Sequence, residues 1–213
     1  MNKEELFKNK IIAIIRNVKS SDILNTVSAL FNGGIRAVEI TFNNATEEGY
    51  NNTLECIKII NKNFGDRMYI GAGTVLNEKA VVDAFNAGAK FILSPNVDTK
   101  VIKKTKELGM ISVPGAITPS EIIKGYNAGA DIVKLFPIGN LGVDYVKAIS
   151  SPINYIPYMA VGGISIDNIE EYKNTGIINF GIGGNLVNLK YIENKDFDKI
   201  TETAKKYIEI FNK

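Results

Sequence analysis

The chain has 213 residues, of which 45% are hydrophobic and 23% charged, with a formal net charge of +2. This balance is typical of a globular protein, and the scattered lysines form no basic stripe of the kind that nucleic-acid-binding proteins carry. The chain has no histidine and a single cysteine, Cys56. These counts exclude a disulfide framework, Ser-His-Asp and Cys-His triads, and the usual zinc and non-haem iron sites. Any acid–base chemistry therefore depends on Glu, Asp, Lys, Tyr or a group of the substrate.

The first residues, 1–8, are charged and amphipathic. This pattern predicts a short extra helix and differs from a secretion signal. No apolar stretch approaches the roughly 18 residues that a membrane-spanning helix needs. Together with the single cysteine, these features predict a cytoplasmic protein.

Eight short apolar runs alternate along the chain with longer segments of helical spacing. The runs are rich in Ile, Val, Phe and Tyr and are too short for helices, which is typical of buried parallel strands. They cover residues 11–16, 37–42, 69–73, 91–95, 111–115, 132–136, 155–163 and 178–184.

The segments between these runs predict helices. The clearest cover residues 21–31, 78–87, 100–108 and 121–128, and a last helix covers 197–211. The segment Thr118-Pro119-Ser120-Glu121 combines a cap, a proline in the first turn and an acid three residues after the cap. Further candidate caps are Ser20, Asn77 and Ser165. Glycine just past a helical run marks the helix ends at positions 33–34, 88, 109 and 129.

The repeating unit of strand and helix predicts the fold. Eight such units of about 25 residues suit an α/β protein with a single (β/α)8 TIM barrel, which runs shorter here than the usual ~250 residues. A doubly wound open sheet is the second choice, but no GxGxxG follows the first strand, where Arg16-Asn17-Val18 stands instead. Because no linker divides the chain, we expect one domain over residues 1–213.

Two lone charges interrupt the apolar runs. Lys134 lies within Ile132-Val133-Lys134-Leu135-Phe136, and Glu39 lies within Ala37-Val38-Glu39-Ile40-Thr41-Phe42. Burial of an unpaired lysine lowers its pKa and makes its amine a nucleophile for carbonyl groups. The two residues lie on the second and sixth predicted strands, which face each other across an eight-stranded barrel. A structural ion pair is the alternative reading. Glu39 would raise the Lys134 pKa, whereas burial and Arg16 would lower it, and the sequence leaves the net sign open.

Other candidate residues follow the strands, at the barrel end where active sites gather. Arg16 ends the first strand and is a candidate clamp for a carboxylate, with a solvated surface charge as the alternative. The Thr74 hydroxyl is a candidate hydrogen-bond donor to the same carboxylate, and a helix-capping role is the alternative. Two glycine pairs follow the last two strands, where barrels often bind phosphate through backbone N–H groups. These pairs are Gly162-Gly163 and Gly183-Gly184.

The motifs AIIR, VEIT, GAGTV, LSPN, VPG, KLFP, VGG and GIGG occur in this order, one in each predicted unit. Together they resemble the bacterial family of 2-keto-3-deoxy-6-phosphogluconate aldolases and 4-hydroxy-2-oxoglutarate aldolases, over residues 11–187. The resemblance implies a (β/α)8 barrel, usually a homotrimer, that needs neither metal nor organic cofactor. It also implies cleavage of 2-keto-3-deoxy acids to pyruvate and an aldehyde through a lysine Schiff base.

The resemblance also implies individual roles. Lys134 matches the Schiff-base lysine and Glu39 the glutamate that transfers protons. The matching substrate-pocket and phosphate-end positions are Thr74, Pro95, Phe136, Gly162, Gly163, Gly183 and Gly184.

Two departures from the family pattern stand out. An arginine is common shortly after the glutamate, where this chain has Phe42-Asn43, and Arg16 is the candidate replacement. Asn43 is similar to the galactonate-type variant. A phosphate-binding serine is common where this chain has Gly184.

Two other functions remain open from the sequence. One is a sugar-phosphate isomerase or epimerase on the same barrel, because fold alone does not determine function. The metal-dependent epimerases use histidines that this chain lacks, and the barrel decarboxylases carry a DxKxxD pattern that is incomplete around Asp131 and Lys134. The other is a non-catalytic protein that binds sugar acids, which the presence of both Glu39 and Lys134 disfavours.

Overall fold

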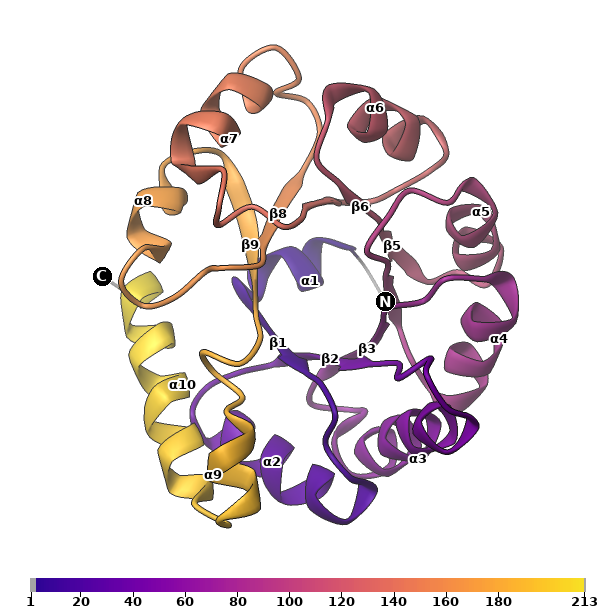
Figure 1. The fold of residues 1–213 in the computed structure, drawn as a ribbon, viewed down its shortest axis with the longest axis vertical. Coiled ribbons are helices and arrows are strands. Elements are labelled where there is room, and N and C mark those ends of the chain that lie inside the picture. The colour runs from indigo at the N-terminus through magenta and orange to yellow at the C-terminus, as the bar shows by residue number, and fades with distance from the viewer. Residues whose placement is uncertain (1–2, 213) are drawn as a thin grey trace.

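A computed structural model describes residues 3–212. Within them, nine parallel strands form one sheet in the order β5-β4-β3-β2-β1-β9-β8-β7-β6. The sheet curls into a nearly closed barrel with helices around its outside (Figure 1). The strands are β1 (Ile11–Ile15), β2 (Ala37–Thr41), β3 (Tyr69–Gly73), β4 (Phe91–Leu93), β5 (Ile111–Val113), β6 (Gly115–Ala116), β7 (Val133–Leu135), β8 (Tyr158–Val161) and β9 (Ile177–Ile182). The predicted (β/α)8 fold is confirmed.

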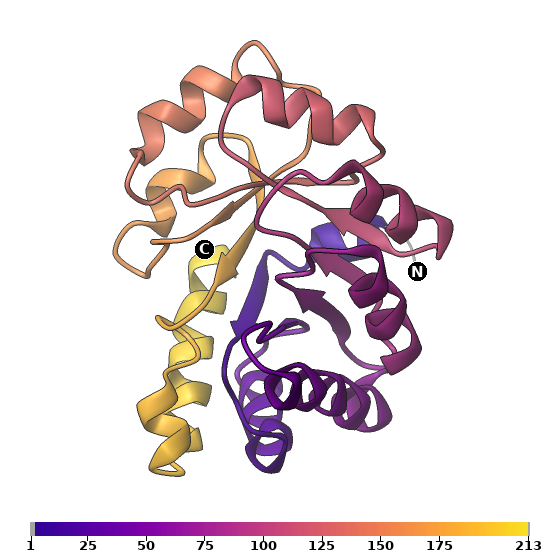
Figure 2. The same ribbon diagram turned by 45° about the vertical axis from the view of Figure 1, so that its right-hand side comes forward.

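Helices accompany the strands, most of them along the outside of the barrel. They are α1 (Lys3–Lys8), α2 (Ser20–Asn32), α3 (Glu47–Phe64), α4 (Glu78–Ala87), α5 (Thr99–Glu107), α6 (Pro119–Asn127), α7 (Gly142–Ser150), α8 (Ile169–Lys173), α9 (Leu189–Glu193) and α10 (Phe197–Asn212). The last helix, α10, lies beside α2, so the two ends of the outer ring meet (Figures 1 and 2). The approach is close, since a Cβ at Gly33 would lie 2.3 Å from the Cβ of Ala204.

The predicted fifth strand is divided in the structure. Pro114 separates β5 from β6, and proline has no N–H to donate to a sheet. The two pieces pair with different neighbours: β5 with β4, and β6 with β7. The Pro114 carbonyl still accepts a hydrogen bond from Lys134 N (2.9 Å). The short segment from β5 to β6 therefore connects the two ends of the sheet order and acts as the fifth barrel strand.

The predicted helix caps are only partly confirmed. Thr118 and Glu121 form the expected capping box, and Asn77 accepts a hydrogen bond from the backbone of α4. Ser20 is not a cap, because the N-cap of α2 is Lys19, without a side-chain hydrogen bond. Ser165 does not open α8 either, since that helix begins later, after Asn168. The Ser165 hydroxyl accepts from Asp167 N (3.2 Å) in the preceding loop instead.

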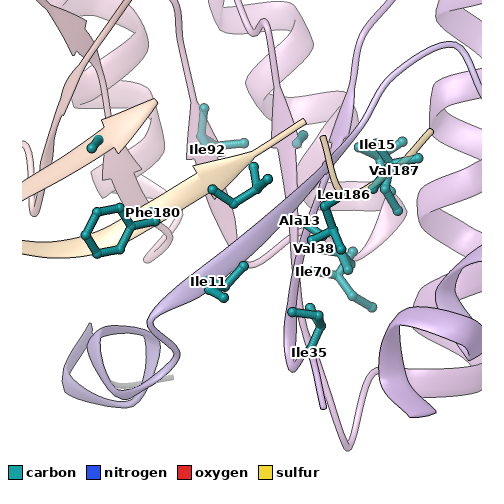
Figure 3. Close-up of a cluster of buried hydrophobic side chains, with 14 of the residues drawn as sticks. Ile11, Ala13, Ile15, Ile35, Val38, Ile70, Ile92, Phe180, Leu186 and Val187 are labelled. Carbon is teal, nitrogen blue, oxygen red and sulfur yellow. The ribbon is translucent and has the colours of Figure 1, made fainter. Parts of the chain in front are cut away.

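Two apolar layers hold the barrel together. The outer layer lies between strands and helices and includes the alternate side chains Ile11, Ala13 and Ile15 of β1 (Figure 3). The inner layer fills the barrel from the opposite faces of the strands, as period-two alternation requires. Its members are Leu6, Ile12, Ala37, Phe91, Leu93, Ile111, Val113, Ile132, Met159 and Val161.

The helix α1 closes the end of the barrel where the strands begin. Figure 1 shows it across the barrel opening, and its Leu6 side chain is fully buried in the inner layer. Buried Asn179 in β9 donates to the backbone carbonyls of Leu6 (3.3 Å) and Asn9 (2.7 Å). The predicted N-terminal helix is thus confirmed over residues 3–8, while the predicted positions 1 and 2 lie outside the described residues.

Candidate active site

Glu39 and Lys134 both lie inside the barrel. Glu39 occupies the middle of β2 and is 3% exposed, and Lys134 occupies the middle of β7 and is 6% exposed. In the sheet register Glu39 is next to Ile14 and Gly71, and Lys134 is next to Gly115 and Met159. Both residues therefore point into the same interior, on opposite sides of the barrel.

The Glu39 carboxylate has one satisfied and one free oxygen. Thr41 donates its hydroxyl to Oε1 (3.2 Å), whereas Oε2 is buried and has no hydrogen-bond partner among the described residues. The space for Oε1 depends on Gly73 in β3, where a Cβ would lie 1.5 Å from that atom. A buried oxygen without a partner is costly to keep, so its retention suits a group that receives a proton or a substrate.

Lys134 has an apolar environment. Its Nζ lies 4.7 Å from the centroid of the Phe136 ring, and Met159 beside it in the sheet is fully buried. Burial disfavours the charged form of an amine. It is the main reason why the pKa of Lys134 is lowered. Arg16 lowers this pKa further, while the Glu39 carboxylate opposes the shift.

Burial also dominates the carboxyl group. It raises the pKa of Glu39 above the ordinary 4.5, against the opposing effects of Lys134, the Thr41 hydroxyl and Arg16. The fold therefore moves both residues toward their neutral forms. A neutral amine is a nucleophile, and a carboxyl group with a raised pKa can donate as well as accept a proton.

Arg16 and Thr74 directly follow the carboxyl ends of β1 and β3. Arg16 is exposed immediately after β1, and its charge acts on both Glu39 and Lys134. Thr74 follows β3 and has a positive φ of 55°, which a β-branched residue rarely adopts. The Asn44 side chain donates to the Thr74 carbonyl (3.0 Å). The structure thus places the guanidinium and Thr74 at the barrel end to which β1, β2 and β3 lead.

Pro95 and Phe136 lie close to Lys134. A Cβ at Gly115, the sheet neighbour of Lys134, would lie 2.4 Å from the Pro95 carbonyl oxygen. Phe136 carries the ring beside the amine and also lies against Gly162, where a Cβ would be 3.2 Å from the ring. Phe136 therefore forms an apolar surface from the lysine to the first glycine loop, and Pro95 lies beyond Gly115 from the lysine.

The two glycine pairs lie on adjacent loops. Gly162 and Gly163 both have positive φ, 88° and 82°, which explains why glycine is needed there. Gly183 and Gly184 differ, because a Cβ at either position would meet nothing within 4 Å. Asn185 connects the two loops by donating to the Ile164 carbonyl (2.9 Å). The second pair therefore borders open space rather than packed protein.

A polar cleft of about 600 Å³ opens near the same end of β1 and β2. Asn17, Ser20, Asn43, Thr46 and Asn52 are among its lining residues, but Glu39 and Lys134 are not. The cleft therefore lies beside the barrel interior. The two buried ionisable groups inside the barrel indicate where the chemistry occurs, because strongly perturbed pKa values cluster at functional sites.

In residues 3–212, no group of three or more His, Cys, Asp or Glu side chains is arranged to hold a metal ion. The helices of that same part of the chain are all too short or too polar to cross a bilayer.

The comparison with known proteins now identifies the family. The family model "KDPG and KHG aldolase" matches residues 3–203. The chain belongs to this family. It is 33% identical over 180 residues to the 2-dehydro-3-deoxy-6-phosphogalactonate aldolase of Escherichia coli K12, covering 84% of this chain and 85% of that protein. It is 30% identical to the 2-dehydro-3-deoxy-phosphogluconate aldolase of Haemophilus influenzae, covering 97% and 95%.

Solved structures agree with this assignment. A structure described as native KDPGal superposes with a TM-score of 0.85 at 29% identity, over 95% of this chain and 94% of the other. The KDPG aldolase of Legionella pneumophila, with pyruvate captured as a covalent carbinolamine, gives a TM-score of 0.87 at 27% identity, over 96% and 97%. The expectation of a class I aldolase, a carbon–carbon lyase, is confirmed, and the isomerase and binding-protein alternatives are not favoured.

Sequence reasoning missed some residues that shape the site. Thr41 lies two positions after Glu39, hence on the same strand face, and this spacing could have revealed it as the hydrogen-bond donor. Gly73 stands out in the sequence only as part of the GAGTV motif, although it provides the space for the carboxylate. Its role depends on a neighbouring strand, so no local signal indicates it.

Proposed function

We propose that this protein cleaves a phosphorylated 2-keto-3-deoxy sugar acid, 2-keto-3-deoxy-6-phosphogluconate or its galactonate epimer, to pyruvate and glyceraldehyde 3-phosphate. The observation that carries the proposal is the buried pair of Lys134, with a lowered pKa, and Glu39, with a raised pKa, inside one barrel. Cleavage of 4-hydroxy-2-oxoglutarate is the second candidate reaction, because the matching family model also covers KHG aldolases.

The first stage of the reaction is formation of the Schiff base. The neutral Lys134 amine attacks the C2 carbonyl of the keto acid, and Glu39 moves the protons that are needed to expel water. Arg16 and Thr74 hold the substrate carboxylate, which fixes the carbonyl against the amine. Pro95 and Phe136 supply the apolar wall beside the reacting carbon.

The second stage is carbon–carbon cleavage. The protonated Schiff base withdraws electrons while Glu39, directly or through one water, takes the proton of the C4 hydroxyl. The C3–C4 bond then breaks and the aldehyde leaves. The resulting enamine is protonated at C3, and hydrolysis releases pyruvate and the free amine of Lys134. The free Oε2 of Glu39 supports this role, since it is available to accept a proton.

The phosphate of the substrate binds at the two glycine pairs, Gly162-Gly163 and Gly183-Gly184. The open space beside the second pair supports this placement. Asn43 and the 33% identity to the phosphogalactonate aldolase of E. coli favour the galactonate series. Chromatographic separation of the two C4 epimers formed from pyruvate and glyceraldehyde 3-phosphate distinguishes the series.

The protein acts as a cytoplasmic homotrimer in this proposal. The resemblance to a usually trimeric family supports the trimer. Apolar side chains on or just before α4 are exposed and available for an interface between subunits: Leu76, Val82 and Phe85, each 37–43% exposed. Light scattering after size-exclusion chromatography tests it, because a monomer of 23.3 kDa is easily told from a trimer.

Borohydride trapping with pyruvate, followed by peptide mass mapping, tests the mechanism. The expected result is a reduced pyruvyl adduct on Lys134. A folded Lys134→Ala variant should form none, and Lys124→Ala, which alters an exposed lysine of α6, should be modified like the parent. A folded parent protein that stays unmodified would refute the pyruvate-aldolase mechanism.

A further inference from the structure

Two asparagine side chains hold the backbone of the glycine loops. Asn168 donates through Nδ2 to the Gly163 carbonyl (2.8 Å). Asn185 donates through Nδ2 to the Ile164 carbonyl (2.9 Å), and so joins the loop after β9 to the loop after β8. Neither residue belongs to the catalytic machinery described above.

The other carbonyls of these loops are also engaged with protein. The Gly162 carbonyl accepts from Gly139 N (2.7 Å). The Gly183 carbonyl accepts from Leu186 N and Val187 N, both at 2.8 Å. Four carbonyl groups in two loops are therefore turned toward protein donors.

Three N–H groups of the same loops remain available. In a planar trans peptide the N–H points opposite to the preceding C=O. The N–H groups of Gly163, Ile164 and Gly184 therefore point away from the donors that hold the carbonyls. Within the described residues none of these three donates a hydrogen bond to protein. Neighbouring free N–H groups of this kind form a concave site for an anion.

We propose that Asn168 and Asn185 are positioning residues that make this aldolase selective for a phosphorylated aldehyde. By holding the Gly163 carbonyl, Asn168 turns that oxygen away from the phosphate and presents the Ile164 N–H to it. Asn185 holds the Ile164 carbonyl away from the phosphate in the same way, and the N–H opposite that carbonyl, of Ser165, donates to Asn168 Oδ1 (2.9 Å). Asn185 additionally sets the distance between the two loops. Backbone N–H groups then bind the phosphate in place of the serine hydroxyl that is common in the family at the position of Gly184. The inference rests on the proposed function, because it concerns the substrate end of the same site.

The test compares two aldehydes that differ only in the phosphate. Condensation of pyruvate with glyceraldehyde 3-phosphate and with glyceraldehyde is measured for the parent, Asn168→Ala and Asn185→Ala. We expect the KM for glyceraldehyde 3-phosphate to rise about tenfold in each variant, the size of one lost hydrogen bond, with kcat little changed. The KM for glyceraldehyde should stay the same. Asn86→Ala, which removes an exposed amide of α4, is the matched control and should alter neither.

Asn185 carries the decisive result, because its side chain is exposed and its alanine variant should fold. An equal change for both aldehydes, or none for either, would overturn the proposal. Borohydride trapping with pyruvate separates this failure from failure of the aldolase mechanism. If the parent protein traps no pyruvate, NMR titration with inorganic phosphate replaces the kinetics. Weaker phosphate binding by Asn185→Ala than by the parent supports the positioning role of Asn185, and equal phosphate binding refutes it.

Discussion

The two ends of the barrel interior are built on opposite principles. The end where the strands begin is filled by Leu6 of α1 and by large apolar side chains such as Phe91 and Ile111. Toward the other end of the barrel, the interior contains Glu39 of β2 and Lys134 of β7. Gly73 of β3 lies there at a position where a packed barrel would carry a side chain. Large buried apolar side chains stabilise a fold, whereas buried charges and unfilled space cost stability.

This difference shows which end of the barrel favours stability of the fold and which end favours catalysis at the expense of stability. At the closed end the Asn179 amide donates twice to hold α1 in place, while its buried Oδ1 has no hydrogen-bond partner among the described residues. At the open end the buried oxygen without a partner in the described residues belongs to an ionisable group, Glu39. Substitutions at the open end should therefore change activity more than stability, and those at the closed end should do the reverse.

The largest expected effect is that of Lys134→Ala. Removing the nucleophile should lower kcat for cleavage by about four orders of magnitude or more. The fold should persist, because a buried amine with a lowered pKa contributes unfavourably to stability in its charged form. Pyruvate release, measured beside circular dichroism, tests both parts. Substantial cleavage by the variant would contradict the assignment of Lys134.

Glu39→Gln should lower kcat by about 10²- to 10⁴-fold, the usual contribution of a general acid–base. Burial raises the pKa of Glu39 above 4.5, so kcat/KM of the parent should fall as the pH drops through that raised pKa. The glutamine variant should lack this acid limb. An unchanged acid limb in the variant would show that another group titrates.

The same shift has a consequence for stability. Between pH 4.5 and the raised pKa, folded Glu39 keeps its proton while the unfolded side chain has lost it. The free energy of unfolding should therefore decrease as the pH rises through this range. Urea unfolding at several pH values should show this decrease in the parent and a smaller one in Glu39→Gln.

The next prediction concerns two glycines of the open end. Gly73→Ala places a Cβ 1.5 Å from Glu39 Oε1 and should displace the carboxylate, whereas Gly183→Ala meets nothing within 4 Å. We expect Gly73→Ala to lower kcat for every aldehyde by about tenfold or more and to cost about 1–3 kcal/mol of stability through overpacking. Gly183→Ala should fold like the parent and should weaken the binding of phosphorylated substrates only. Equal kinetic behaviour of the two variants would contradict the space-making role of Gly73.

Much of the barrel could be predicted from the sequence because its signals are local. The strand runs are continuous and apolar, and the cap at Thr118 and the glycines after several helices mark boundaries directly. Glu39 and Lys134 stood out for the same reason, as single charges in runs that burial requires to be apolar. The division at Pro114 also has a local cause, although the predicted strand passed through it.

What could not be predicted depends on contacts between distant segments. The net direction of the Lys134 pKa shift results from burial, Glu39 and Arg16 together, and their relative strengths follow from positions across the barrel. The position of α1 under the barrel is set by Asn179, about 170 residues away. Asn185 and Ile164 meet only because β8 and β9 are neighbours. None of these contacts leaves a pattern in the nearby sequence.

The smallest effect on catalysis is expected at the closed end. Leu6→Ala removes a fully buried side chain of α1 from the inner layer and should lower the free energy of unfolding by about 2–5 kcal/mol. The kcat per folded molecule should stay unchanged, because Glu39 and Lys134 lie farther along the strands. Denaturant unfolding and active-site titration by pyruvate trapping measure the two quantities separately. Lys8→Ala, an exposed position of the same helix, is the control and should leave both near the parent values. A loss of kcat that exceeds the loss of folded protein would show that packing at the closed end positions the catalytic pair, and would break the distinction between the two ends.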